Sequence, residues 1–369
     1  MHSIDPQFKK IFDEMEEGHL QLHQRLNAWP ERGVELEARL SNELKSYTSW
    51  RSFLADKLGE ITLDINQQGK DVCHRYIRET KYYKVVQEAP FYWRIINKPE
   101  GYAGDAEMMN LIYRNLYEGS TAFGMLLHRD AVSSEACQAV RNRRDLLKEK
   151  ISETGGGKIL SVAAGPAMEI RDILTEDQSE DTFHCHAFDH DIKTIRNVYK
   201  SFQDSRFKYL LGNAFHLIKG RFKVAVPRDF AINYCNPRED FSGFNRLFTP
   251  IKYAFETLQK ENYDLVYSAG LYDYIKTFSA DNTKGTIALT ENLFNLVKPG
   301  GSLIIGNFSP VNPRNLRFMM EFINDWHLIY RTKQDMLDFA RAIPEREIRH
   351  MEVLQEPLGI NYFLKIVKA

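Results

Sequence analysis

Small and polar residues follow four short apolar runs in the second half of the sequence, and together they could bind a nucleoside. The runs end in Ala164-Gly165-Pro166, Asp189, Gly212-Asn213 and Ser268-Ala269-Gly270. Ligands of an open parallel sheet bind outside the carboxyl ends of its strands. There an aspartate at the second strand end can accept hydrogen bonds from both ribose hydroxyls, and an asparagine at the third can bond an adenine edge. These residues predict a site for an adenosine-containing cofactor.

Other nucleotide-binding motifs are missing from the sequence. There is no G-x-G-x-x-G, which disfavours a nicotinamide cofactor, and no G-x-x-x-x-G-K-[ST] phosphate loop. The 49 Lys and Arg residues nearly balance the 50 Asp and Glu residues. A surface that binds nucleic-acid phosphates usually shows a basic surplus. We therefore expect a small-molecule partner and no nucleic acid.

After Glu153 the sequence alternates between predicted strands and helices, which would position these residues. Short apolar runs alternate with helix-like stretches such as residues 168–174, a pattern typical of a parallel sheet with helices on both faces. Residues 351–354 and 362–367 flank a Pro-Leu-Gly turn and predict an antiparallel hairpin at one edge. The prediction is an α/β fold with a Rossmann-like, mostly parallel sheet and an antiparallel C-terminal hairpin.

Residues 1–150 show helical periodicity instead. Apolar residues recur at spacings near three and four, as in Phe8-Ile11-Phe12-Met15, and prolines separate the segments. A length of 369 residues favours two domains. We predict a helical N-terminal domain over residues 1–150, acting as a lid or substrate domain, and a sheet domain over residues 151–369.

The connection over about residues 215–262 is long for a link between two strands. It contains an apparent helix through Phe248 and Phe255. We interpret it as an elaboration over the ligand face of the sheet. A surface excursion without function is an alternative of equal weight.

Cysteine and histidine spacing predicts no metal site. The cysteines at 73, 137, 185 and 235 form no C-x-x-C pair, and the eleven histidines form no H-E-x-x-H, although His184 and His186 alternate on one strand face. So few cysteines are typical of reduced thiols. No apolar run approaches the roughly 18 residues of a membrane helix, and the first residues lack an apolar signal-peptide core. We expect a cytoplasmic protein without membrane insertion.

The strand-end residues, residues 159–167 and Lys298-Pro299-Gly300-Gly301 resemble the class I S-adenosylmethionine-dependent methyltransferases. The resemblance covers about residues 155–369. It implies S-adenosyl-L-methionine as the cofactor and S-adenosyl-L-homocysteine as its product. The tetrapeptide N/D-P-P-Y/F/W of many nucleic-acid methyltransferases does not follow the fourth strand, which agrees with a small-molecule acceptor.

The first loop departs from the family pattern acid-x-Gly-x-Gly-x-Gly. Ser161, Ala163, Gly165 and Ala167 occupy the four positions, so the acid is missing and two glycines are replaced by alanine. Alanine is tolerated there if the backbone angles are not left-handed. The ammonium group of the cofactor then needs another carboxylate, and Glu169 is our candidate.

A narrower resemblance reaches upstream, to about residue 90. It is to a bacterial group, the 3-hydroxypalmitic acid methyl ester biosynthesis methyltransferase type, and it implies carboxyl O-methylation of a fatty acid. The matching segments are residues 97–105 (NKPEGYAGD), 108–115 (MMNLIYRN), 139–144 (AVRNRR), 159–167 (ILSVAAGPA) and 268–274 (SAGLYDY).

The strand ends and the resemblance together give the predicted site residues. Two glycines bracket Tyr102, which we predict to face the cofactor or acceptor; a turn in which Asp105 caps the next helix is the alternative. Arg141, Arg143 and Arg144 could bind a carboxylate, or form a solvated helix face. The predicted catalytic residues are Tyr102, Asp273 and Tyr274, and the predicted substrate-binding residues are Tyr113 and Tyr272. The predicted cofactor-binding residues are Ala163, Ala164, Gly165, Pro166, Glu169, Asp189, His190, Gly212, Asn213, Ala214, Ser268, Ala269, Gly270 and Arg143.

The nature of the acceptor decides whether a base is needed. A carboxylate is already deprotonated at neutral pH, whereas a hydroxyl or amine needs a general base, for which Asp273 is a candidate. Aromatic residues at 91–93, Tyr113 and Phe123 could line an apolar acceptor pocket or form helical core. Alternatives to an acid acceptor are N-, O- or C-methylation of another metabolite, and a degenerate, non-catalytic scaffold of the same fold.

Overall fold

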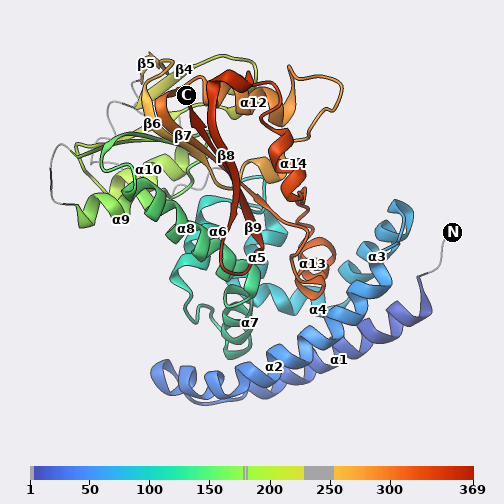
Figure 1. Cartoon of the computed structure of the whole chain (residues 1–369). Helices are drawn as coiled ribbons and strands as arrows, with labels where there is room; N and C mark the ends of the chain where they lie inside the picture. Colours follow the sequence, from blue (N-terminus) through green and yellow to red (C-terminus); the bar gives the residue numbers. More distant parts are fainter. Residues whose placement is uncertain (1–3, 178, 180–181, 228–252) are drawn as a thin grey trace, which may run out of the picture. The chain divides into compact units, whose positions relative to one another are not determined.

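The computed structural model of the chain describes residues 4–177, 179, 182–227 and 253–369 (Figure 1). It consists of two compact units. Unit 1 comprises Met1–Asn142 and Pro310–Leu328, and unit 2 comprises Arg143–Ser309 and Ile329–Ala369.

The division between the units differs from the sequence-based one at residue 150. It falls inside helix α8 (Glu135–Ser152), between Asn142 and Arg143. A later segment, Pro310–Leu328, also joins the helical unit. This segment is helical in part and packs on helix α2 (Gly33–Thr62), so tertiary packing, which local periodicity does not encode, assigns it to unit 1.

Unit 1 is built from helices. They are α1 (Pro6–Asn27), α2, α3 (Gln67–Glu79), α4 (Lys81–Val85), η1 (Val86–Glu88), α5 (Pro90–Asn97), α6 (Ala106–Arg114), α7 (Ala122–Val132), α13 (Arg314–Phe318) and the π-helix η3 (Met319–Ile323). Asp5 begins α1 by accepting the N–H groups of residues 7 and 8, with Pro6 in the first turn. Phe8, Phe12 and Met15 are buried, which confirms the apolar stripe of the first helix.

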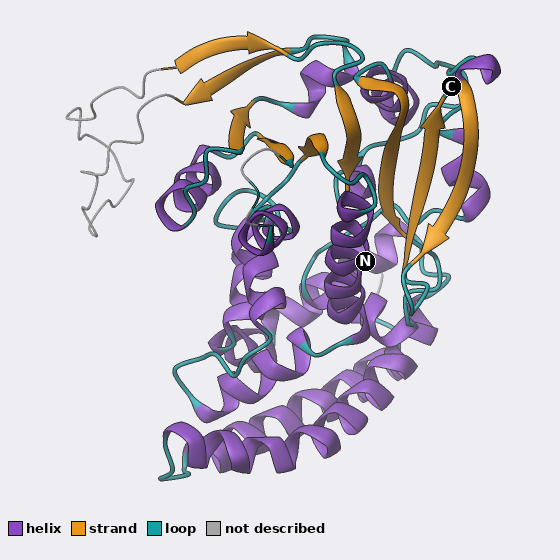
Figure 2. Ribbon diagram, turned by 60° about the vertical axis from the view of Figure 1, so that its left-hand side comes forward, coloured by secondary structure: helices purple, strands orange, loops and turns teal. Residues whose placement is uncertain are grey.

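Unit 2 is built on one sheet, which has nine strands among the described residues (Figure 2). Its order is β5-β4-β3-β2-β1-β6-β7-β9-β8. The strands are β1 (Gly157–Val162), β2 (Phe183–Asp189), β3 (Phe207–Leu211), β4 (Lys223–Pro227), β5 (Tyr253–Thr257), β6 (Tyr263–Ser268), β7 (Val297–Phe308), β8 (Ile348–Gln355) and β9 (Asn361–Lys368). Strands β3, β2, β1, β6 and β7 are parallel, so their carboxyl ends meet at one edge.

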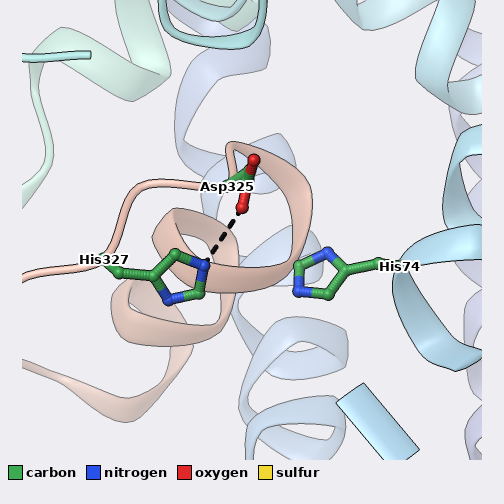
Figure 3. Close-up of side chains that lie close together, drawn as sticks. All are labelled: His74, Asp325 and His327. Atoms are coloured by element: carbon green, nitrogen blue, oxygen red, sulfur yellow. Dashed lines mark hydrogen bonds and ion pairs between the residues drawn. The ribbon is translucent and has the colours of Figure 1, made fainter. Parts of the chain in front are cut away.

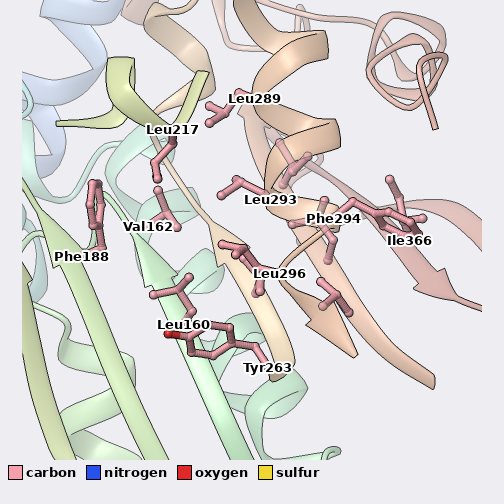
Figure 4. Packing of buried hydrophobic residues seen from close by; sticks show 14 of the residues in the cluster. Leu160, Val162, Phe188, Leu217, Tyr263, Leu289, Leu293, Phe294, Leu296 and Ile366 are labelled. Carbon is pink, nitrogen blue, oxygen red and sulfur yellow. The ribbon is translucent and has the colours of Figure 1, made fainter. Parts of the chain in front are cut away.

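Helices cover both faces of the sheet, and each face has its own apolar core. On one face, side chains of α8, α9 (Met168–Glu176) and α10 (Ile192–Ser201) pack with β1–β3. On the other, α11 (Ala214–Ile218) and α12 (Gly285–Phe294) supply residues such as Leu217 and Leu293 (Figure 4). The same core includes Met336 of α14 (Lys333–Asp338). The remaining short turns are η2 (Tyr272–Tyr274) and η4 (Glu345–Glu347). The predicted α/β fold is confirmed.

The C-terminal strands form the predicted antiparallel hairpin, since β9 pairs with β8 and with β7 in antiparallel register. The prediction of a helix through Phe255 is wrong. Phe255 lies in β5, opposite Ala225 of β4. The aromatic residues of β5 suit a pleated strand, and the ladder to β4 satisfies its backbone. Phe248 lies outside the described residues.

None of the described helices is long and apolar enough to cross a membrane.

Candidate functional site

The loop after β1 keeps a left-handed backbone at alternate residues. Ala163, Gly165 and Ala167 have φ of 57°, 53° and 48°. The condition under which alanine is tolerated there is therefore not met, because both alanines are left-handed. A β-carbon in this region crowds the following carbonyl and costs about 1–2 kcal/mol per residue. The loop thus retains the conformation of a glycine-rich loop although only one of the three positions is glycine.

Asp189, the last residue of β2, holds this loop in place. Its Oδ2 accepts the N–H of Gly165 at 2.8 Å, and its Oδ1 accepts those of His190 at 2.7 Å and Asp191 at 3.0 Å. The carboxylate is almost fully buried. The hydrogen bond of the His190 ring with Asp189 raises the pKa of His190. Each carboxylate oxygen has two acceptor sites, so Oδ2 retains capacity for a further donor such as a hydroxyl.

The end of β3 is tied to the same aspartate. The N–H of Gly212 donates to the backbone oxygen of Asp189 at 2.9 Å. A β-carbon on Gly212 would lie 2.5 Å from the ring of Phe188, so only glycine fits without a shift. Asn213 is exposed, and its side chain caps α11 by accepting the N–H of Phe215 at 2.8 Å, with Ala214 as the first helical residue.

The end of β6 lies beside β1 and forms a hydrogen bond with an arginine. The hydroxyl of Ser268 donates to the backbone oxygen of Val162 at 3.0 Å. Arg143 is buried, and its Nη1 donates to the backbone oxygen of Ala269 at 3.0 Å. The guanidinium is 3.4 Å from where a β-carbon of Gly270 would lie. Ala269 and Gly270 therefore allow a buried cation at this strand end.

The other two arginines of the predicted cluster are engaged elsewhere. Arg141, in unit 1, donates to the backbone oxygens of Ile112 and Val132 at 2.9 and 2.8 Å. Arg144 forms an ion pair with Asp172. Of the three, Arg143 is the one at the strand ends.

Glu169, in the first turn of α9, is buried below the first loop. The hydroxyl of Tyr267 donates to its Oε1 at 2.7 Å, and Ser161 interacts with the same hydroxyl. Burial raises the pKa of Glu169. The carboxyl group thus lies one tyrosine hydroxyl away from Ser161, the position where the family pattern has an acid.

Asp273, in η2 after β6, connects two strand ends. Its Oδ1 accepts the N–H of Phe308, the last residue of β7, at 2.7 Å. Burial raises its pKa to about 7. Arg331 donates to the backbone oxygen of Tyr272 at 2.7 Å and to Asn307 at 2.6 Å, which fixes the same turn. A carboxyl group of this pKa can exchange a proton near neutral pH.

The two tyrosines beside Asp273 differ. Tyr272 is fully buried in the apolar core, and its hydroxyl bonds to Thr290 at 3.0 Å. Its predicted role in binding substrate is therefore not supported, because the tight turn of η2 directs it inward. Tyr274 is 45% exposed at the strand end.

Tyr102 and Tyr113 belong to unit 1 and keep their roles as predictions. Tyr102 lies in a turn that Gly101 enters with φ of 87°. Asp105 caps α6 by accepting the N–H of Met108 at 2.9 Å and pairs with Arg94 at 2.6 Å. The turn therefore has a clear structural function.

Most of the aromatic side chains proposed for an acceptor pocket are helical core of unit 1. Phe91, Tyr92 and Phe123 are buried, while Trp93 is 46% exposed. The sequence analysis also missed a group in unit 1, formed by His74, Asp325 and His327 (Figure 3). No spacing signal could reveal it, because α3 and the segment after η3 lie far apart in the sequence.

No protein-family model and no curated protein matches the chain. Solved structures do share its architecture. A possible exported protein from Bordetella parapertussis gives a TM-score of 0.51 at 13% identity, over 88% of this chain and 96% of its own. The 1,6-didemethyltoxoflavin-N1-methyltransferase of Burkholderia thailandensis, with bound S-adenosylhomocysteine, gives 0.36 at 12% identity over 65% and 82%. The CurJ carbon methyltransferase gives 0.45 at 12% identity over 98% and 91%. At this level of identity, the likeness to the Bordetella structure shows a shared fold.

Proposed function

We propose that the chain is an S-adenosylmethionine-dependent methyltransferase that acts on a small molecule, with carboxyl O-methylation of a 3-hydroxy fatty acid or a similar apolar acid as the leading reaction. The observation that carries the proposal is the Asp189 carboxylate at the end of β2, which accepts the Gly165 N–H of a left-handed first loop. The resemblance of the strand-end residues to class I methyltransferases supports it, and so does the order of the parallel strands.

The residues present fit such a cofactor. A β-carbon on Gly165 would meet no atom within 4 Å, so the first loop leaves room for a ligand against its backbone. Oδ2 of Asp189 would accept a ribose hydroxyl, and the exposed Asn213 would meet the adenine edge. Arg143 offers a positive charge for the carboxylate of the methionine part, and the buried carboxyl group of Glu169 is the candidate partner of the ammonium group.

The cofactor, when bound, supplies an electrophilic methyl group on a sulfonium. A carboxylate acceptor would take up this methyl group without losing a proton, so it would need no base. The chain's residues then contribute orientation and exclusion of water. The alternative is a hydroxyl or amine acceptor, which would need a base. Asp273 would serve, because burial raises its pKa to about 7.

Cofactor binding is tested by calorimetric titration of the full chain with S-adenosylhomocysteine. The variants are Asp189→Ala and, as a matched control, Asp264→Ala at the amino end of the sheet. Asp264 also accepts a backbone N–H next to β1, that of Lys158 at 2.7 Å. We expect micromolar binding by the wild type and the control, and loss of binding in Asp189→Ala. Unchanged binding in Asp189→Ala would contradict the proposal, and no binding by any form would favour a non-catalytic scaffold.

The acceptor is tested with methyl-labelled cofactor and 3-hydroxy acids of increasing chain length. We expect methyl transfer to long-chain acids. We also expect the Asp273→Asn variant to retain this activity. Equal rates for short and long chains would count against an apolar acid. A rate that rises as the pH passes about 7, and that Asp273→Asn abolishes while binding persists, would instead assign a hydroxyl or amine acceptor.

A further inference from the structure

Unit 1 brings two imidazoles and a carboxylate together. One nitrogen of His74, one nitrogen of His327 and one oxygen of Asp325 lie within 4.8 Å of one another. His74 comes from α3, and the other two come from the segment that follows η3 (Figure 3). Two imidazole nitrogens and one carboxylate oxygen form a donor set typical of divalent transition metals, zinc in particular. We propose that His74, Asp325 and His327 bind a divalent transition-metal ion, with Zn²⁺ as the reference ion.

The carboxylate is held in a fixed orientation. Its Oδ2 lies 3.3 Å from Nζ of Lys98 and 3.4 Å from Nη2 of Arg78. Lys98 also donates to the backbone oxygen of Asp325 at 2.8 Å. These cations oppose a metal ion by charge, but both engage the same oxygen. The other oxygen, Oδ1, lies 3.1 Å from Nε2 of His327. The metal ion takes the place of the proton shared by these two atoms.

The imidazole of His74 is also oriented before any ligand binds. Its ring stacks on that of Phe322, with centroids 5.2 Å apart and planes 11° apart. Ligands whose rotamers are fixed by neighbouring groups lose less freedom on binding.

The backbone that carries two of the ligands is unusual. The π-helix η3 ends two residues before Asp325, whose φ is 49°. The N–H of Trp326 donates back to the oxygen of Met320 at 2.8 Å, which closes the wide turn. Single π-turns and left-handed non-glycine residues cost free energy and occur often at functional sites. Here they direct Asp325 and His327 toward His74.

The cluster opens into a cleft of about 620 Å³, which has room for the water or anion that completes a metal's coordination. Lys70, Arg75 and Arg78 line the same cleft together with Asp71 and Glu79. Cys73, the neighbour of His74, is buried and is not one of the three grouped side chains, so the proposed ligands are nitrogen and oxygen donors.

The test uses the full chain after removal of metals with a chelator. Zn²⁺ is titrated by calorimetry, and Co²⁺ is titrated by absorption spectroscopy, since cobalt bound to nitrogen and oxygen lacks the thiolate charge-transfer bands of a cysteine site. The variant is His327→Ala. Its side chain is 52% exposed, so its loss should leave the fold of the metal-free protein intact. The matched control is His350→Ala, because His350 is an exposed histidine beside a carboxylate, 3.6 Å from Glu352.

We expect one equivalent of Zn²⁺ in the wild type and the control, and binding at least tenfold weaker in His327→Ala. Zn²⁺ should also raise the unfolding temperature of the wild type and the control, but not that of His327→Ala. Equal affinity in all three proteins, thiolate bands with Co²⁺, or no binding by the wild type would each overturn the proposal. It is independent of the methyltransferase proposal, because S-adenosylhomocysteine binding is measured separately.

Discussion

The two ends of the sheet in unit 2 both have residues with positive φ, but the residue types differ. At the amino end of β1, residues 155–157 have φ of 67°, 132° and 101°, and all three are glycine. At its carboxyl end, Ala163, Gly165 and Ala167 have φ between 48° and 57°. Glycine adopts these angles without steric cost, whereas alanine does not. The carboxyl end therefore keeps strain that the amino end avoids.

The acidic side chains at the two ends of the sheet also differ in their surroundings. At the amino end, Asp264 is partly exposed and pairs with Lys298 at 2.8 Å. At the carboxyl end, Asp189 is buried against backbone N–H groups, and burial raises the pKa of Glu169 and of Asp273. Strain and buried carboxyl groups with shifted pKa values are typical of ligand-binding ends rather than of structural ones. The contrast supports placing the proposed cofactor site at the carboxyl end.

The largest expected effect concerns Asp273. Its pKa is about 7 in the folded chain against an ordinary value of 3.8, so folding favours the protonated form. Its contribution to stability is then complete below about pH 4 and is lost as the pH rises through about 7. The free energy of unfolding falls by about 4 kcal/mol at most through this group. The side chain of the Asp273→Asn variant stays neutral at every pH. The variant should therefore lack this fall in stability with rising pH, and it should be more stable than the wild type at pH 8.

Urea unfolding of wild type and Asp273→Asn at pH 4 and pH 8 measures this effect. Other titrating groups affect both proteins equally, so the difference between the two proteins isolates Asp273. A difference that stays constant with pH would show that Asp273 titrates alike in the folded and unfolded chain, and would weaken the contrast between the two ends.

The second effect compares two matched carboxylates. Asp189→Asn leaves one of three backbone N–H groups without an acceptor in a buried place, which should cost about 2 kcal/mol. Asp264→Asn keeps an acceptor for the Lys158 N–H and loses the partly exposed pair with Lys298, which should cost about 1 kcal/mol or less. Added salt should reduce the loss of stability in Asp264→Asn and leave that in Asp189→Asn unchanged. Urea unfolding at low and high salt measures both. Equal losses would mean that both aspartates have the same structural role.

Much of the sheet could be predicted because its signals are local. A parallel strand is a short apolar run, and the residue that ends it, such as Asp189, follows directly in the sequence. The C-terminal hairpin is marked by its turn. Phe255 was misassigned because the apolar spacing around a short and mostly exposed strand resembles that of a helix until a neighbouring strand is known.

The candidate site could be predicted only in part. Asp189 and Gly212 lie at the ends of β2 and β3 and bond to each other, and Arg143 bonds to Ala269 after β6; their roles stay predictions. The inward direction of Tyr272 depends on a 3-10 turn that no residue type marks, and the left-handed angles of the two alanines oppose their own preferences. His74, Asp325 and His327 meet only through tertiary packing, so a search of spacings does not find them.

The smallest expected effects on the free energy of unfolding test the backbone strain of alanine at positive φ. Gly155→Ala places a β-carbon at φ of 67° in open space, so the loss of about 1 kcal/mol comes from the backbone alone. Ala163→Gly is the reverse exchange at the carboxyl end. Relief of about 1–2 kcal/mol of strain exceeds the added chain entropy of roughly 0.5–1 kcal/mol, so this variant should gain about 0.5 kcal/mol.

Ala167→Gly separates strain from packing at the same loop. Its φ of 48° promises the same relief, but its methyl group is fully buried in the core, and losing a buried methyl costs about 0.8 kcal/mol. The two terms nearly cancel, so unfolding in urea should show little change. A clear gain in Ala163→Gly with none in Ala167→Gly would mean that the first alanine is strained without a packing reason, as expected of a loop shaped for a ligand. A loss in Ala163→Gly would mean that its left-handed angle is not strained in this protein.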